Sequence, residues 1–80
     1  MEIQFASRAL RQYRKLTPDI KRDVMAGLAE LKNWPHVRGV KSLQGRNDYR
    51  LRVGRYRMIF AVDGDIIWVT DIVIRNESTY

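Results

Sequence analysis

The sequence contains no cysteine, which excludes a disulfide, a thiolate metal site and a cysteine nucleophile and fits a reducing compartment. Long apolar runs are also missing. The longest run without a charged residue, Val24 to Ala29, is far shorter than the ~20 apolar residues of a membrane span. Residues 1–5 lack the basic start and apolar core of a signal peptide. We therefore expect a cytoplasmic protein, and 80 residues predict a single domain spanning residues 1–80.

Acidic residues are scarce in one quarter of the chain. The formal net charge is +6, and the segment from Arg38 to Arg57 holds seven basic residues and one acid, Asp48, so the other sixty residues are neutral on balance. Eleven of the 15 cations are arginines, which bind phosphate bidentately and stack on bases. This concentration favours a nucleic-acid partner. A basic face that only keeps the protein soluble is the alternative.

The N-terminal half has the pattern of one short strand and two helices. Residues 2–5 alternate in polarity, as in a strand. Apolar residues three or four positions apart then predict an amphipathic helix, on the face formed by Ala6, Ala9, Leu10, Tyr13 and Leu16. Thr17-Pro18-Asp19 is a helix start signal. The second helix has its buried stripe at Ile20, Val24, Leu28 and Leu31 and ends near Asn33, before Trp34-Pro35.

The C-terminal half has the pattern of strands. We expect a loop over residues 35–46. A period of two then predicts strands over 49–53 and 56–62, and the mostly apolar run over 66–74 predicts a third strand. Turns at Gly54-Arg55 and Asp63-Gly64-Asp65 join them. The order strand, helix, helix, strand, strand, strand predicts an α+β fold. Two N-terminal antiparallel helices would pack on one face of a small antiparallel sheet.

This arrangement fixes the direction of several arginines. The apolar residues of the strand over 49–53 must face the helices, so Arg50 and Arg52 must face away. Their side chains then lie roughly 6.5–7 Å apart along the strand, close to the spacing of successive phosphates in an extended nucleic-acid strand. Arg57 on the neighbouring strand joins them if the hairpin register permits.

Two segments of the chain resemble the RelE/ParE toxins of bacterial toxin–antitoxin pairs. Leu43-Gln44-Gly45 and the residues from Tyr49 to Phe60, YRLRVGRYRMIF, resemble the family core L-x-G…YRLRVGxYRVIY. The tail from Arg75 to Tyr80 resembles a closing segment in which many members carry a basic residue and a tyrosine. The resemblance covers essentially all 80 residues in element order and implies the RelE-like fold.

The resemblance implies one of two activities. RelE-like members enter the ribosomal A site and cut mRNA by attack of a 2′-hydroxyl on the adjacent phosphate, whereas ParE-like members inhibit DNA gyrase. A third possibility is an inactive relative that acts with its antitoxin as a DNA-binding co-repressor. We expect the first, a metal-independent endoribonuclease without a cofactor. Its expected partners are a cognate antitoxin, which neutralises members of both branches, and mRNA in the ribosomal A site.

Within this hypothesis the catalytic candidates are Arg57, Arg75 and Tyr80. Arg57 matches the arginine of the family's YR pair and would contact the scissile phosphate. Tyr80 would stack on a base, with Arg75 as its partner in the tail. Arg50 and Arg52 stand where ribosome-dependent members often carry two lysines. Because the pKa of arginine is above ~12, it is a poor general base, and phosphate clamping is the expected role of both.

Three further residues are candidates for phosphate binding: Lys41, Arg46 and Arg55. Lys41 would instead be a base if the surrounding arginines lower its pKa. Glu77 is an alternative proton acceptor, or an ordinary surface acid. His36, the sole histidine, is expected to be a loop residue, and one histidine without cysteine argues against a zinc site. The sequence assigns no role to Trp68.

Overall fold

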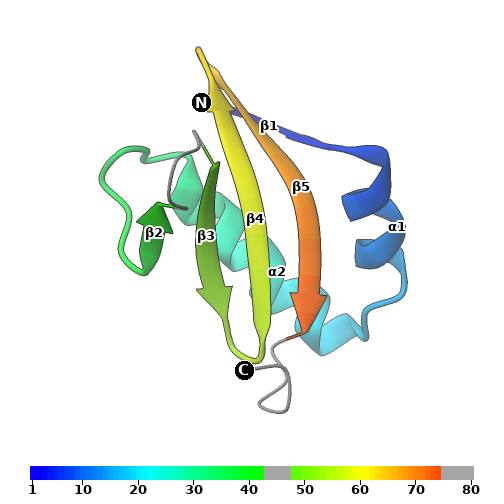
Figure 1. The fold of residues 1–80 in the computed structure, drawn as a ribbon. Coiled ribbons are helices and arrows are strands. Elements are labelled where there is room, and N and C mark those ends of the chain that lie inside the picture. Colours follow the sequence, from blue (N-terminus) through cyan, green and yellow to red (C-terminus); the bar gives the residue numbers. More distant parts are fainter. Residues whose placement is uncertain (43–47, 75–80) are drawn as a thin grey trace.

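The computed structural model describes residues 1–42 and 48–74 (Figure 1). The elements are β1 (Glu2–Phe5), α1 (Ser7–Arg14), α2 (Pro18–Leu31), β2 (Val40–Ser42), β3 (Asp48–Val53), β4 (Tyr56–Asp63) and β5 (Ile66–Ile74). The five strands form one sheet in the order β1-β5-β4-β3-β2. The α+β class with two helices packed on a sheet is confirmed.

The helix start and the buried stripe of α2 agree with the sequence prediction. The Thr17 side chain accepts a hydrogen bond from the Ile20 amide at 3.5 Å, and Pro18 occupies the first helical turn. Val24, Leu28 and Leu31 are buried. In α1 the prediction fails at one position, because Leu10 is 37% exposed. It follows the buried Ala9 by one residue, about 100° around the helix, and so falls outside the buried stripe.

The sheet is mixed, so the prediction of an antiparallel sheet is wrong at one edge. β1 runs parallel to β5, from the pair Glu2–Ile66 to the pair Phe5–Val69, while the other neighbours are antiparallel. The two helices carry the chain from β1 across the sheet to β2 at the far edge. The antiparallel hairpin with β4 then leaves the other edge of β5 open, and β1 occupies part of that edge. The polarity pattern of residues 2–5 contains no information on strand direction.

The predicted loop over residues 35–46 also needs a correction, because residues 40–42 form β2. This strand pairs antiparallel with β3, with Val40 opposite Leu51. Three residues are too few to show a period of two. Both predicted hairpin turns are confirmed: Val53 pairs with Tyr56, and Asp63 pairs with Ile66.

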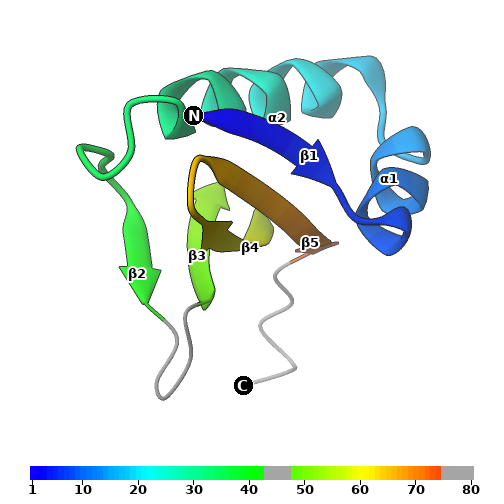
Figure 2. The same ribbon diagram turned by 90° about the horizontal axis from the view of Figure 1, so that it is seen from above.

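The core lies between the helices and one face of the sheet. Its fully buried side chains include Phe60, Leu31, Met58, Ile67, Val24 and Val69. A register shift between Ile59 and Phe60 places one extra residue in β5, so that both Val69 and Ile72 face the core. Figure 2 shows α2 across this side of the sheet. Within the described residues, the opposite side of β2, β3 and β4 has no helix over it.

Helix α1 completes the edge of β5 beyond the end of β1. The Gln12 Oε1 accepts a hydrogen bond from the Ile72 amide at 2.7 Å, and the Gln12 Nε2 donates to Asp71 Oδ1 at 3.1 Å. Arg8 adds a contact of 3.7 Å to Asp71 Oδ2. A side chain thus satisfies a strand amide that has no strand partner. In the described part of the chain neither helix has the length and apolar character needed to cross a membrane.

Candidate nucleic-acid interface

Alternation along β3 and β4 directs three arginines to the helix-free face of the sheet. Leu51 is 5% exposed and faces the core, so its neighbours Arg50 and Arg52 face the other way. Met58 is buried in β4, and its neighbour Arg57 faces the same side as Arg50 and Arg52. The sequence prediction for the direction of these three side chains is confirmed.

The sheet register then brings the cations of three strands together. Arg52 of β3 lies directly opposite Arg57 of β4, and Arg50 of β3 lies directly opposite Lys41 of β2. Four cations therefore form two like-charged cross-strand pairs on one face. The second pair depends on β2, the strand that the sequence pattern does not reveal.

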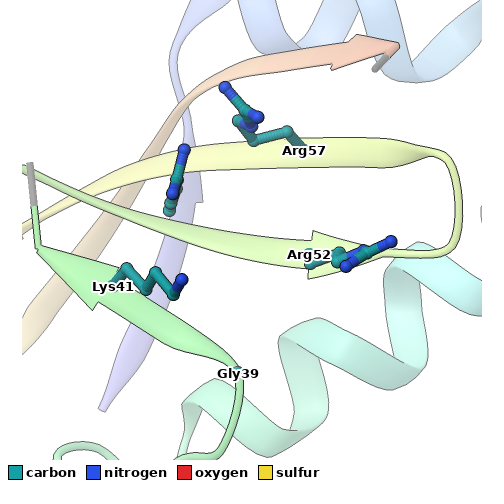
Figure 3. A pocket seen from close by; sticks show the side chains of 5 residues that line it. Gly39, Lys41, Arg52 and Arg57 are labelled. Atoms are coloured by element: carbon teal, nitrogen blue, oxygen red, sulfur yellow. The ribbon is translucent and has the colours of Figure 1, made fainter. Parts of the chain in front are cut away.

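These side chains line a hollow of about 290 Å³ together with Gly39. We call this hollow, formed by Gly39, Lys41, Arg50, Arg52 and Arg57, the basic groove. Figure 3 shows Lys41, Arg52 and Arg57 reaching it from three neighbouring strands. Gly39 has a φ of 78°, a left-handed conformation that favours glycine, and no side chain fills the groove at this point. Gly39 was not among the predicted site residues.

Of the described acids, Asp48 lies on the same face of β3 as Arg50 and Arg52, but it does not line the groove. Lys41, Arg50 and Arg52 form no ion pair with any residue in 1–42 or 48–74. Asp71, on the neighbouring strand β5, has its carboxylate held by Arg8 and Gln12 of α1 instead. Guanidinium and ammonium groups gathered in this way create a positive potential that attracts polyanions. The planar guanidinium groups and the compact ammonium group can both donate hydrogen bonds to phosphate oxygens.

The other residues considered in the sequence analysis do not line the basic groove or lie outside the described residues. Arg55 is exposed in the turn between β3 and β4 and does not line the groove, so its phosphate contact stays a prediction. His36 is exposed in the segment between α2 and β2 and is not part of the groove. Arg46, Arg75, Glu77 and Tyr80 lie outside the described residues. The last described residue, Ile74, pairs with Tyr56, next to Arg57, so the chain enters its C-terminal tail at the Arg57 end of the sheet.

A second hollow, of about 400 Å³, lies between β1 and α2 and has a different character. Most of its lining is apolar, with Ile3, Phe5, Met25 and Leu28 among the side chains. The charged residues there, Glu2 and Lys32, have opposite signs. This hollow does not offer the clustered donors that a phosphate requires, and the basic groove is the better candidate for an anion.

The chain is similar in fold to solved structures of toxins and of a toxin–antitoxin complex. The isolated RelE toxin of E. coli matches with a TM-score of 0.83 and 22% identity, over 95% of this chain and 85% of that chain. The E. coli RelBE toxin–antitoxin complex matches with a TM-score of 0.77 and 25% identity, over 95% and 96%. The YoeB/ParE toxin of Agrobacterium tumefaciens matches with a TM-score of 0.81 and 14% identity, over 95% and 100%.

Comparison of the sequence alone finds no relative. No protein-family model matches the chain, and no curated protein matches it. The resemblance seen in the sequence motifs is nevertheless confirmed in three dimensions, because the matches cover almost the whole described architecture. The chain has the fold of the RelE-like toxin superfamily.

Proposed function

We propose that the chain is the toxin of a type II toxin–antitoxin pair and acts in the cytoplasm as an endoribonuclease on mRNA in the ribosomal A site. The observation that carries this proposal is the basic groove, where four cations from three strands converge on the face that no described helix covers. The similarity to RelE and to the RelBE complex supports the toxin class and an antitoxin partner.

The proposed reaction needs little from the protein except charge and position. The 2′-oxygen of a ribose attacks the adjacent phosphorus, the bond from phosphorus to the 5′-oxygen breaks, and the products are a 2′,3′-cyclic phosphate and a 5′-hydroxyl. The phosphorus passes through a state with extra negative charge, which fixed cations stabilise. Arg52 and Arg57 would hold the reacting phosphate between them. Lys41 and Arg50 would hold a neighbouring phosphate and so align the strand.

Two proton transfers complete the reaction. One proton leaves the 2′-hydroxyl and one reaches the 5′-oxygen, and arginine does not supply the base because its pKa is above ~12. No carboxylate or imidazole of the described residues lines the groove. The candidates are therefore Lys41 in the groove and Glu77 in the tail. Arg75 would assist Tyr80 in holding the RNA.

Induction of the chain without an antitoxin, followed by primer extension on cellular mRNA, tests the proposal. We expect cuts inside translated codons and arrest of growth. Arg57→Ala should reduce the cleavage rate by about 100- to 1,000-fold, as loss of one donor to a developing oxyanion does. Arg14→Ala, which removes an exposed arginine of α1, is the matched control and should cleave at the wild-type rate.

Other outcomes have clear meanings. Intact mRNA combined with gyrase-dependent DNA breaks would identify a ParE-like inhibitor. Unimpaired growth with abundant folded protein would identify an inactive relative. Full toxicity of a folded Arg57→Ala variant would overturn the role of the groove in cleavage.

A further inference from the structure

Trp68 differs from the other aromatic side chains that the structure describes. The others belong to the core or pack against it, namely Phe5, Tyr13, Trp34, Tyr49, Tyr56 and Phe60. Trp68 does neither, makes no ring contact within residues 1–42 and 48–74, and remains 37% exposed. The indole therefore contributes little to the core, although its apolar area is large.

The register places this indole on the same face as the basic groove. Trp68 lies in β5 between the buried residues Ile67 and Val69, so its side chain faces away from the helices. Its partner in β4 is Ala61 and its partner in β1 is Gln4. Ala61 is small and Gln4 is exposed, so neither cross-strand neighbour places a large apolar side chain over the ring.

The distance from Trp68 to the groove suits a nucleic-acid strand. Arg50 pairs with Ile59, and Ala61, two residues farther along β4, pairs with Trp68. With strands ~4.8 Å apart and ~3.3 Å of rise per residue, the Cα atoms of Arg50 and Trp68 lie about 12 Å apart across the face. A few nucleotides of extended single strand span such a distance.

We propose that Trp68 is a stacking platform for a base of the same RNA strand whose phosphates occupy the basic groove. This inference rests on the RNA binding proposed above and extends that site by one nucleobase subsite. Exposed aromatic rings beside cationic grooves bind single strands in this way, because every base has a flat face that stacks on them. The contact tolerates any base, so it would fix the path of the RNA and not its sequence.

Titration with single-stranded 2′-O-methyl RNA oligonucleotides of increasing length tests the proposal. These probes lack the attacking hydroxyl and cannot be cleaved by 2′-oxygen attack. We expect the tryptophan fluorescence of the wild-type protein to be quenched once the oligonucleotide is long enough to reach from the groove to Trp68. Trp34, which packs against Tyr49 and Phe60, provides the unquenched background in the Trp68→Leu variant.

Three variants make the affinity measurement specific. Trp68→Leu should bind the long oligonucleotide about 5- to 150-fold more weakly, since stacking contributes ~1–3 kcal/mol per base. Trp68→Phe should retain most of the affinity. Leu10→Ala removes a side chain with the same exposed fraction, 37%, from α1 and should bind like the wild type.

The possible outcomes distinguish an error in the stacking platform from an error in the RNA binding of the groove. If Arg50→Gln weakens binding but Trp68→Leu does not, the groove binds RNA and the stacking platform is wrong. If the wild type binds no RNA at all, the stacking platform is wrong, while primer extension on cellular mRNA tests the proposed ribosomal cleavage separately. If Trp68→Leu binds RNA normally but loses its antitoxin, the ring is a protein contact and the present inference is overturned.

Discussion

Arg52 and Arg57 lie directly opposite each other across the hairpin between β3 and β4. Like charges in this position destabilise a strand pair, whereas opposite charges contribute roughly 0.2–1 kcal/mol. The pair Lys41–Arg50 repeats the arrangement one strand farther. A fold selected only for stability would place a carboxylate in one of these positions. An anion bound between the cations would relieve this repulsion.

The first prediction separates activity from stability at Arg52. Replacing it by threonine, a neutral residue that favours strands, should slow mRNA cleavage while leaving the free energy of unfolding unchanged or raising it by up to about 1 kcal/mol. Urea denaturation and primer extension on the same preparations provide the two measurements. A variant that is clearly less stable than the wild type would contradict the repulsion argument.

The second prediction concerns the salt dependence of RNA binding. Each phosphate contact to single-stranded nucleic acid contributes about 0.7 to the slope of log affinity against log salt concentration. Arg50→Gln should therefore lower the magnitude of this slope by about 0.7, measured by fluorescence anisotropy with a cleavage-resistant oligonucleotide. Arg14→Gln, on exposed α1 surface, should keep the wild-type slope. Equal slopes in both variants would place Arg50 away from the RNA backbone.

The third prediction concerns the contact between α1 and β5. Ile72 is 4% exposed and its amide donates to Gln12, so Gln12→Leu leaves a buried donor unsatisfied. We expect a loss of about 1–3 kcal/mol in the free energy of unfolding, with faster hydrogen exchange at the Ile72 amide. Arg11→Leu makes a similar change at the adjacent exposed position and should cost much less. Comparable losses in both variants would mean that the Gln12 contact adds nothing specific.

The fourth prediction concerns the approach of α2 to the sheet. A Cβ atom on Gly27 would lie 3.2 Å from Leu51 Cδ2 and 3.2 Å from Val53 Cγ2. Gly27→Val should therefore destabilise the protein by about 1–3 kcal/mol through overpacking. Ala26→Val places the same β-branched residue on the exposed side of the helix and serves as the control. The midpoint temperatures of thermal unfolding give the comparison between the two variants. Equal midpoints would contradict the tight packing of α2 against β3.

Much of the fold could be predicted because local chemistry determines it. The cap at Thr17, the spacing of Val24, Leu28 and Leu31, and the glycine turns are all short-range signals that the structure confirms. The direction of Arg50, Arg52 and Arg57 followed from alternation alone. The parallel pairing of β1 with β5 could not be predicted in this way, because it joins distant residues whose side chains alternate identically in either direction.

The site was predicted less completely than the fold. Lys41 was a candidate by charge, but its position opposite Arg50 depends on the three-residue strand β2. Gly39 was predicted only as part of the loop over residues 35–46. Trp68 had no assigned role because its strand is largely apolar on both faces, and the burial of its neighbours Ile67 and Val69 in the structure shows which face is exposed. The roles of Arg46, Arg75 and Tyr80 stay predictions.

The pairing of Glu2 with Ile66 also affects how a newly made chain acquires its shape. β1 is synthesised before β5, which is its strand partner among the described residues, so it stays unpaired until β5 has been made. Closing so long a loop costs entropy and slows folding. Messages broken or terminated before the codons for β5 would therefore yield fragments with an unmatched N-terminal strand. Formation of this strand pair is thus coupled to translation of β5.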